Sequence, residues 1–245
     1  MVYDILFEGP FELVEIIYDK MSIIRTQEQN QLIEEIWKNV TKENPYIYNG
    51  DLVGIKQHQT AQNRLEVQVC KSTYKEFIGT RDSFYVKKFG MKNIANPLSV
   101  CALIITSDDK IVLGKRSKFV DLSKLKLTIP SGWIDPSKDL KFNKIDAFEV
   151  IKRETGEELG IYQNELTLKC LGLVFNRMFN HSFIPFWGIT KLDSSTIFER
   201  KRNDEFSELV KFENNVGKLL SKHHEQLSDV AKATLFLYKK ALNST

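Results

Sequence analysis

Apolar and polar residues alternate along the first two segments of the chain. YDILFE (residues 3–8) and ELVEIIYD (residues 12–19) lie on either side of Gly9 and Pro10. A period of two is typical of a strand with one buried face, and a Gly-Pro pair interrupts regular structure. We therefore expect two strands with a break between them.

A helix and a hairpin are predicted to follow. Thr26 can cap a helix, and Gln29, three residues later, completes a capping box. Residues 51–59 and 64–72 alternate again around the polar run TAQN, which is typical of a hairpin. Together these elements predict a small α+β accessory region over residues 1–94. The apolar positions that define its helix are Leu32, Ile33, Ile36 and Trp37.

A second domain is expected over residues 95–245, where longer apolar runs begin. Gly160 is predicted to end a helix that starts near Asp146, and residues 226–242 form a second, amphipathic helix. Because no low-complexity linker separates the two regions, we expect them to pack closely. The strands predicted in the second region cover residues 98–106, 111–117, 126–135, 166–175 and 182–192.

Composition narrows the class of protein. Of the 245 residues, 42% are hydrophobic and 27% are charged, which is ordinary for a soluble globular protein. The net charge of +3 is too small to indicate nucleic-acid binding by bulk electrostatics. No apolar run reaches the roughly 18 residues of a membrane span, and the acidic N-terminus does not resemble a signal peptide. We therefore expect a cytoplasmic protein with no nucleic-acid and no membrane partner.

The number and spacing of the cysteines are consistent with a cytoplasmic protein. Cys70, Cys101 and Cys170 are an odd number, widely spaced, and each lies in an apolar, strand-like run. Disulfides and zinc sites have closer or paired spacings in a chain of this kind. We interpret the three residues as buried, reduced thiols.

The run RETGEELGI, residues 153–161, is the clearest chemical signal. Residues three and four positions apart share a helix face, so Glu154, Glu157 and Glu158 are expected to project together. Three like charges repel one another, and Arg153 cannot neutralise all of them. Mg²⁺ prefers carboxylate oxygens and binds with phosphate ligands. The run therefore indicates either a solvated helix face or a metal-phosphate site.

The order of these residues resembles the second half of the Nudix signature. That half reads R-E-U-x-E-E-x-G-U, with U aliphatic, and only Thr155 departs from it. LTIPSGWID (residues 127–135) looks like the glycine loop that precedes the Nudix helix. The resemblance implies an α+β fold, a Nudix α/β/α sandwich with the smaller N-terminal region packed against it. It also implies hydrolysis of a nucleoside diphosphate joined to a further group.

The same resemblance implies roles for individual residues. Arg153 is expected to orient a glutamate through a bidentate pair, and a glutamate or a metal-bound hydroxide would activate the attacking water. The ligands that the resemblance implies for Mg²⁺, or for Mn²⁺, are Glu154, Glu157, Glu158 and the carbonyl of Gly132.

The chain departs from the signature upstream of the helix. Thirteen residues separate the glycine and the arginine of the signature, whereas twenty separate Gly132 from Arg153. The first glutamate of the signature is absent from its expected positions. Asp139 and Asp146 are the candidates to replace it. We favour Asp146, because an acid just before a helix also complements the helix dipole.

Two segments of the first region are similar to the eukaryotic UDP-sugar Nudix hydrolases. These are NPYIYNGDLVGI (residues 44–55) and STYKEFIGTRD (residues 72–82). That group also has a longer loop before the Nudix helix. The resemblance implies a UDP-sugar as the small-molecule substrate, cleaved to UMP and a sugar 1-phosphate. The candidate substrate-binding residues are Arg116, Tyr74, Phe77 and Thr80.

Alternatives remain at several positions. Arg116 is either a phosphate ligand or a surface residue, the aromatic pair is either pocket wall or core, and His181 is either a base or an exposed side chain. A Nudix hydrolase for ADP-ribose, a dinucleotide or coenzyme A would carry the same signature. A binding module that has lost its chemistry is also compatible with the absent first glutamate, although the retained acids argue against it.

Overall fold

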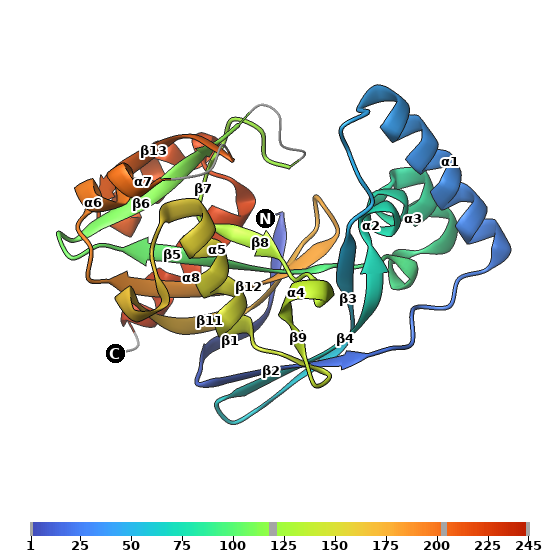
Figure 1. The fold of residues 1–245 in the computed structure, drawn as a ribbon, viewed down its shortest axis with the longest axis horizontal. Coiled ribbons are helices and arrows are strands. Elements are labelled where there is room, and N and C mark those ends of the chain that lie inside the picture. Colours follow the sequence, from blue (N-terminus) through green and yellow to red (C-terminus); the bar gives the residue numbers. More distant parts are fainter. Residues whose placement is uncertain (1, 118–121, 202–204, 244–245) are drawn as a thin grey trace.

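The computed structural model of the chain describes residues 2–117, 122–201 and 205–243. Figure 1 shows two lobes side by side, each built around its own sheet. The fold is mixed α+β, as the sequence predicted. Within the described ranges, no helix has both the length and the apolar character needed to span a membrane.

The larger lobe contains an eight-stranded mixed sheet. Its strand order is β1-β11-β12-β5-β6-β13, with β7 paired to β6 and β8 paired to β5. β12 and β5 run parallel, and the other neighbours run antiparallel. The strands are β1 (Tyr3–Phe11), β5 (Leu98–Ile105), β6 (Lys110–Arg116), β7 (Leu127–Thr128), β8 (Ser131–Trp133), β11 (Leu166–Asn176), β12 (His181–Thr190) and β13 (Phe206–Glu213).

The centre of the larger sheet is buried on both faces, because a helix covers each of them. α5 (Ala147–Leu159) packs on one face and α8 (Asp229–Asn243) on the other. Alternate residues of β5 enter the two cores: Val100 belongs to the core with α5, and Leu103 to the core with α8. Every residue of β5 is therefore buried. This is the sandwich arrangement expected from the sequence.

The ends of α5 lie where the sequence predicted them. The side chain of Asp146 accepts hydrogen bonds from the backbone N–H groups of Phe148 and Glu149, which caps the helix N-terminus. Gly160 follows the last turn with φ of 68°, in the left-handed region that favours glycine. The hydroxyl of Thr155, the one loose position of the signature, donates to the Lys152 carbonyl, so the polar group is satisfied inside the core.

The smaller lobe contains a five-stranded sheet in the order β3-β4-β2-β10-β9. The predicted hairpin is confirmed as β3 and β4, and the predicted capping box is present between Thr26 and Gln29 at the start of helix α1 (Gln27–Glu43). These strands are β2 (Leu13–Asp19), β3 (Asp51–Ala61), β4 (Arg64–Thr73), β9 (Leu140–Lys141) and β10 (Lys144–Ile145).

The remaining helices flank the two sheets. Several short elements were not predicted from the sequence, because their apolar patterns are short. They are the helices α2 (Tyr74–Arg81), α3 (Ser83–Phe89), α6 (Ser194–Arg200) and α7 (Val216–His223), and the strand β13. The helices are α1 (Gln27–Glu43), α2 (Tyr74–Arg81), α3 (Ser83–Phe89), α4 (Pro136–Asp139), α6 (Ser194–Arg200) and α7 (Val216–His223), and single 3₁₀ turns cover Met91–Asn93, Gln163–Glu165 and His224–Gln226.

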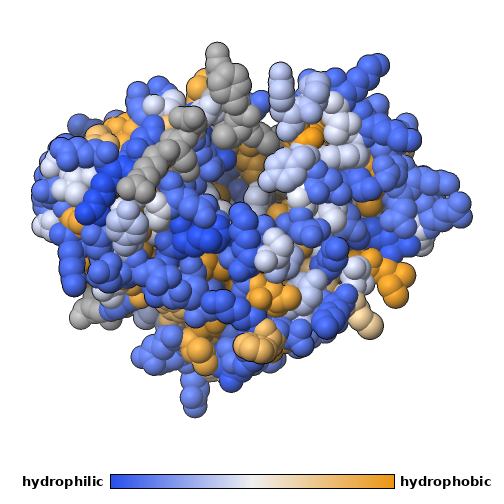
Figure 2. All heavy atoms as spheres, viewed as in Figure 1, coloured by the Kyte–Doolittle hydropathy of each residue, from blue (hydrophilic) through white to orange (hydrophobic). Residues whose placement is uncertain are grey.

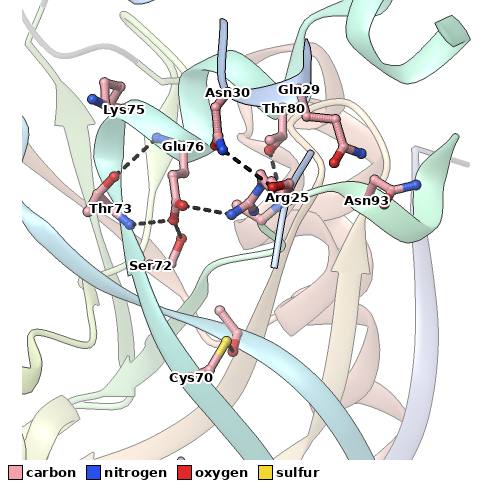
Figure 3. A network of polar contacts seen from close by, with 12 residues as sticks. Arg25, Gln29, Asn30, Cys70, Ser72, Thr73, Lys75, Glu76, Thr80 and Asn93 are labelled. Carbon is pink, nitrogen blue, oxygen red and sulfur yellow. Dashed lines mark hydrogen bonds and ion pairs between the residues drawn. The ribbon is translucent and has the colours of Figure 1, made fainter. Parts of the chain in front are cut away.

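A buried ion pair fixes the start of α2. The side chain of Arg25 is only 3% exposed and donates to Glu76 at 2.6 Å (Figure 3). The same carboxylate accepts from the Ser72 hydroxyl at 2.8 Å and from the backbone N–H of Thr73 at 3.2 Å. The chain segment before α1 is thereby tied to the first turn of α2, which begins with Tyr74.

The chain crosses between the lobes more than once. β1 lies in the larger sheet and β2 in the smaller one, so the first 94 residues contribute to both. The lengthened loop after Gly132 forms α4, β9 and β10, and the last two strands extend the smaller sheet along β2. Whether residues 1–94 and 95–245 fold as separate domains stays a prediction.

The break between the first two strands was expected at Gly9 and Pro10, but it lies two residues further along the chain, at Glu12. β1 continues through both residues to Phe11, and its pairing with β11 shifts register between Glu8 and Phe11. Proline cannot donate to a ladder, and an edge strand with an irregular register tolerates it. The bend that separates β1 from β2 is at Glu12.

The cysteines are buried, free thiols, in agreement with the sequence interpretation. Burial raises the pKa of Cys101 and of Cys170 to about 12, which keeps both protonated.

Candidate active site

The glycine loop and α5 meet at Gly132. β8 aligns Gly132 with Val100 of the central strand, and the side chain of Glu154 lies directly against the glycine. A Cβ atom at position 132 would overlap the Glu154 carboxylate. Only glycine lets the backbone approach the glutamate this closely. The loop and the glutamate run, separated in sequence, therefore form one site.

Glu158 is the most deeply buried acid of this site. It is 1% exposed, and its Oε2 atom accepts a hydrogen bond from the Ser131 N–H at 3.2 Å. Its Oε1 atom is buried and has no hydrogen-bond partner within the described residues. Burial raises the pKa of Glu158 well above its ordinary value, and the nearby carboxylates of Glu205 and Glu154 raise it further.

Glu154 and Glu157 occupy different environments, although they belong to the same run. Burial raises the pKa of Glu154 to about 7, against the opposing effect of the Arg153 guanidinium at 2.7 Å. The Glu157 side chain is 54% exposed and pairs with Arg153 at 3.3 Å. The expectation that the three glutamates project together therefore needs refinement, because Glu158 is buried, Glu154 is partly buried and Glu157 is exposed.

Arg153 connects the glutamates to the lengthened loop. Its Nε atom lies 3.2 Å from Oδ1 of Asp139, and its Nη2 atom lies 3.1 Å from Oδ2. Asp139 also accepts from the backbone N–H of Asp135 at 2.9 Å. Asp146 instead caps α5. Of the two candidates for the absent glutamate, Asp139 lies against Arg153, whereas the sequence argument favoured Asp146.

Arg116 and Glu205 complete the polar wall of a cavity of about 250 Å³ beside Gly132 and Glu154. They form an ion pair at 2.8 Å. Sequence reasoning missed Glu205, because it belongs to no motif. Its one signal is its place immediately before β13, whose pairing with β6 begins at Arg116.

The carboxylates fit a divalent cation by their chemistry. In the described part of the chain, no three His, Cys, Asp or Glu side chains are grouped closely enough to hold a metal ion. Arg153 pairs with Glu154 and Glu157, and Arg116 pairs with Glu205. The unused oxygen of Glu158 is a buried acceptor that a cation would satisfy.

The predicted substrate-binding residues of the first region separate into two groups. Tyr74 lines a larger cavity of about 1080 Å³ between the lobes. Phe77 is fully buried and packs edge-on against Trp133 at 5.3 Å between ring centres. Thr80 is 1% exposed, and its hydroxyl accepts from the backbone N–H of Ala95. Phe77 and Thr80 thus occupy supporting positions, and their contact with a substrate stays a prediction.

His181 is buried in an aromatic cluster, which excludes the exposed alternative. It is 3% exposed and contacts Phe77 and Trp133 edge-on. Burial, with a contribution from the charge of Arg81, lowers the pKa of His181 to about 3, so the imidazole is neutral at physiological pH. Its Nδ1 atom is buried without a hydrogen-bond partner among the residues described.

The two cavities share part of their lining. Trp133 and Glu154 line both of them, and the larger one also reaches Arg153 and Glu157. Figure 2 shows that this face of the molecule is mostly hydrophilic, with apolar residues in small scattered groups. A ligand of nucleotide size would fit the larger cavity, since typical ligand pockets measure about 300–1,000 Å³.

Comparisons with known proteins found likenesses among solved structures. No family profile and no curated protein matches the sequence. Among solved structures, the chain is similar to a mutT/nudix family protein from Listeria innocua (17% identical, TM-score 0.45), over 60% of this chain and 94% of that one. An Ap4A hydrolase from C. elegans is 15% identical over 60% of this chain and 99% of that one, with a TM-score of 0.43. An ADP compounds hydrolase is 18% identical over 79% of this chain and 95% of that one, with a TM-score of 0.42.

Proposed function

We propose that the chain is a Nudix-type hydrolase that cleaves the pyrophosphate bond of a nucleoside diphosphate derivative. The observation that carries the proposal is the pair Glu158, which is buried, and Glu154, whose side chain is 12% exposed, beside Gly132, with one Glu158 oxygen unpartnered in the described structure. Two acids that are neighbours and largely removed from water cost stability unless a cation or a proton joins them. A site kept for structure alone would be expected to lose them.

The carboxylates would hold Mg²⁺ or Mn²⁺. Glu158 is our first choice of ligand, because it alone combines complete burial with an unused oxygen. Glu154, Glu157 and the carbonyl of Gly132 are the further ligands. When bound, the cation would neutralise phosphate oxygens and lower the pKa of a water molecule that attacks phosphorus.

The chain's own residues would position the reacting groups. Asp139 holds the Arg153 guanidinium, which in turn contacts Glu154, so this carboxylate has a fixed orientation. Arg116 lies in the cavity beside Gly132 and would contact a phosphate once its pair with Glu205 opens. Trp133 and the buried aromatic cluster behind it exclude water from that side of the site.

We further propose a UDP-sugar as the substrate, with UMP and a sugar 1-phosphate as products. Two segments that resemble the UDP-sugar group contribute Tyr48 and Tyr74 to the lining of the larger cavity, which Glu154 and Glu157 also line. This placement supports a contact between the first region and the nucleotide.

A panel of substrates tests both levels of the proposal. UDP-glucose, UDP-galactose, ADP-ribose and a dinucleotide would be supplied at equal concentration with Mg²⁺, and the phosphate-containing products would be identified. We expect cleavage, with the UDP-sugars preferred. Cleavage with a clear preference for ADP-ribose would keep the hydrolase and reject the UDP-sugar. In Tyr74→Ala the ranking is expected to change, whereas Phe77→Ala should mainly lower stability.

A binding module without chemistry is the second candidate, because arginines hold three of the site carboxylates in ion pairs. Such a module would bind a nucleoside diphosphate derivative in the presence of Mg²⁺ and release it unchanged. Product analysis after prolonged incubation separates this candidate from a hydrolase.

A further inference from the structure

Two tyrosines on the wall of the larger cavity are highly exposed. Tyr46 is 94% exposed and Tyr48 is 79% exposed, and both line this cavity together with Tyr74 and Trp133. Neither was among the predicted substrate-binding residues. Tyrosine has a large apolar ring with a polar end, and aromatic side chains gathered on a concave surface are typical of binding sites.

Hydrogen bonds hold the segment that carries the two tyrosines. The Asn49 side chain accepts from the backbone N–H of Lys75 at 2.7 Å, and the Gly50 carbonyl accepts from the backbone N–H of Tyr74 at 2.9 Å. These contacts fasten the segment to the first turn of α2. The Tyr48 ring lies against Gly50, where a Cβ atom would come within 3.1 Å of the ring. Tyr48 is thus exposed on a backbone that is already ordered, which lowers the entropy cost of binding.

Residues of the candidate active site line the same cavity as the tyrosines. They are Arg153, Glu154 and Glu157, and Glu154 also lines the smaller cavity beside Gly132. The smaller cavity, about 250 Å³, is below the size of typical ligand pockets. A diphosphate derivative held at Glu154 therefore has room for the larger part of its molecule in the larger cavity, which the two tyrosines line.

We propose that Tyr46 and Tyr48 form a subsite that stacks on the nucleobase of the substrate. The inference rests on the proposed function, because it assumes a nucleotide as the ligand. Every base has a flat π-face, so a tyrosine ring can stack on it without reading its edge. Removal of one stacking ring is expected to weaken nucleotide binding roughly tenfold.

Two ligands that differ in the base test the proposal. UMP and ribose 5-phosphate share a ribose and a phosphate, and UMP contains no pyrophosphate bond to cleave. Their affinities for the full chain can be measured by calorimetry with Mg²⁺ present. In Tyr48→Ala, and more so in Tyr46→Ala with Tyr48→Ala, UMP affinity should fall roughly tenfold or more. The affinity for ribose 5-phosphate should not change, and Tyr48→Trp should retain UMP binding.

A matched control comes from a tyrosine elsewhere on the surface. Tyr162 is 49% exposed and does not line the larger cavity. Tyr162→Ala should leave the affinities for UMP and ribose 5-phosphate unchanged. Thermal melts of all variants show whether the fold is intact.

Four outcomes would overturn the subsite. These are undetectable UMP binding to the unaltered chain, unchanged UMP affinity in both alanine variants, equal losses for UMP and ribose 5-phosphate, and a loss for glucose 1-phosphate in place of UMP, which would assign the tyrosines to the sugar. The proposed hydrolysis can fail separately. If UMP binding follows the expected pattern and no nucleoside diphosphate derivative is cleaved, the subsite stands and the hydrolase does not.

Discussion

Asp139 and Arg153 form a two-pronged ion pair between the lengthened loop and the signature helix, with atom separations of 3.2 Å and 3.1 Å. Asp139 belongs to α4 and Arg153 to α5. The residues added to the loop thus do two things: they extend the smaller sheet, and they deliver a carboxylate to the arginine next to Glu154. We interpret Asp139 as the substitute for the absent glutamate.

Asp139→Asn is expected to raise the Mg²⁺ concentration required for activity. Without the carboxylate, Arg153 loses its bidentate partner and is free to bind Glu154 or Glu157 more tightly. Asp146→Asn should have a smaller effect, because asparagine caps a helix about as well as aspartate. Activity measured against Mg²⁺ concentration compares the two variants. Equal and negligible changes would mean that Asp139 does not act on the site.

Gly132→Ala is expected to abolish activity while the protein stays folded. The new methyl group would overlap the Glu154 carboxylate and displace it. Gly156→Ala is the control. Gly156 lies on α5, the helix that carries Glu154, and a Cβ atom there would meet only the Ile161 carbonyl at 3.4 Å. Alanine is favoured over glycine inside a helix by roughly 1 kcal/mol, so this control should be as stable as the parent or more so. Normal turnover in Gly132→Ala would contradict the close approach.

Glu154→Gln should remove part of the pH dependence of stability in metal-free protein. The pKa of Glu154 is about 7 when folded and 4.5 ordinarily, so the folded state holds this proton more tightly. That stability is fully present below about pH 4.5 and is lost as the pH rises through about 7. Relative to the parent, the variant should gain about 3 kcal/mol between pH 4.5 and pH 8.

Denaturant unfolding in EDTA across this pH range measures that gain. Glu157→Gln serves as the control, because the Glu157 side chain is more than half exposed. Added Mg²⁺ should stabilise the parent at pH 8. A constant difference between Glu154→Gln and the parent at all pH values would refute the burial argument.

Arg25→Ala should destabilise the chain by about 3 kcal/mol. It leaves the Glu76 carboxylate at the start of α2 without its cation, and breaking a largely buried pair is costly. The exposed pair between Lys75 and Glu34 provides the comparison, and Lys75→Ala should cost less than about 1 kcal/mol. Denaturant unfolding of both variants checks the difference. Similar losses would show that Arg25 contributes no more than a surface charge.

Sequence patterns predicted the elements whose signals are local. The capping box at Thr26, the hairpin, the helix from Asp146 to Gly160 and the central strand β5 all follow from spacing within a few residues. Short elements such as α6 and β13 were not predicted, because seven or eight residues contain too few repeats of a helical or strand pattern to be recognised. β1 was predicted as a strand, but its place in the larger sheet depends on contacts with β11 that are remote in sequence.

The candidate site likewise has features that the sequence predicted and features that depend on contacts remote in sequence. The sequence placed Glu154, Glu158 and Gly132 in one motif, and the structure brings them together. It did not predict that Glu157 lies near solvent, that Glu205 lies beside Glu158, or that Asp139 contacts Arg153. Each of these depends on how the loop and the strand β13 pack against α5. The sequence argument for Asp146 rested on its place just before a helix, and in the structure this acid caps α5. Which of the two aspartates replaces the glutamate stays a prediction.

Turnover of UDP-glucose by the parent chain and by Glu158→Gln, with Mg²⁺, tests the central claim most directly. The parent should release UMP and glucose 1-phosphate, EDTA should stop the reaction, and Mg²⁺ or Mn²⁺ should restore it. Glu158→Gln should be inactive and fully folded, because the amide relieves the repulsion from Glu154 and Glu205. Near-normal turnover in Glu158→Gln, or no cleavage of any nucleoside diphosphate derivative by the parent, would contradict the account.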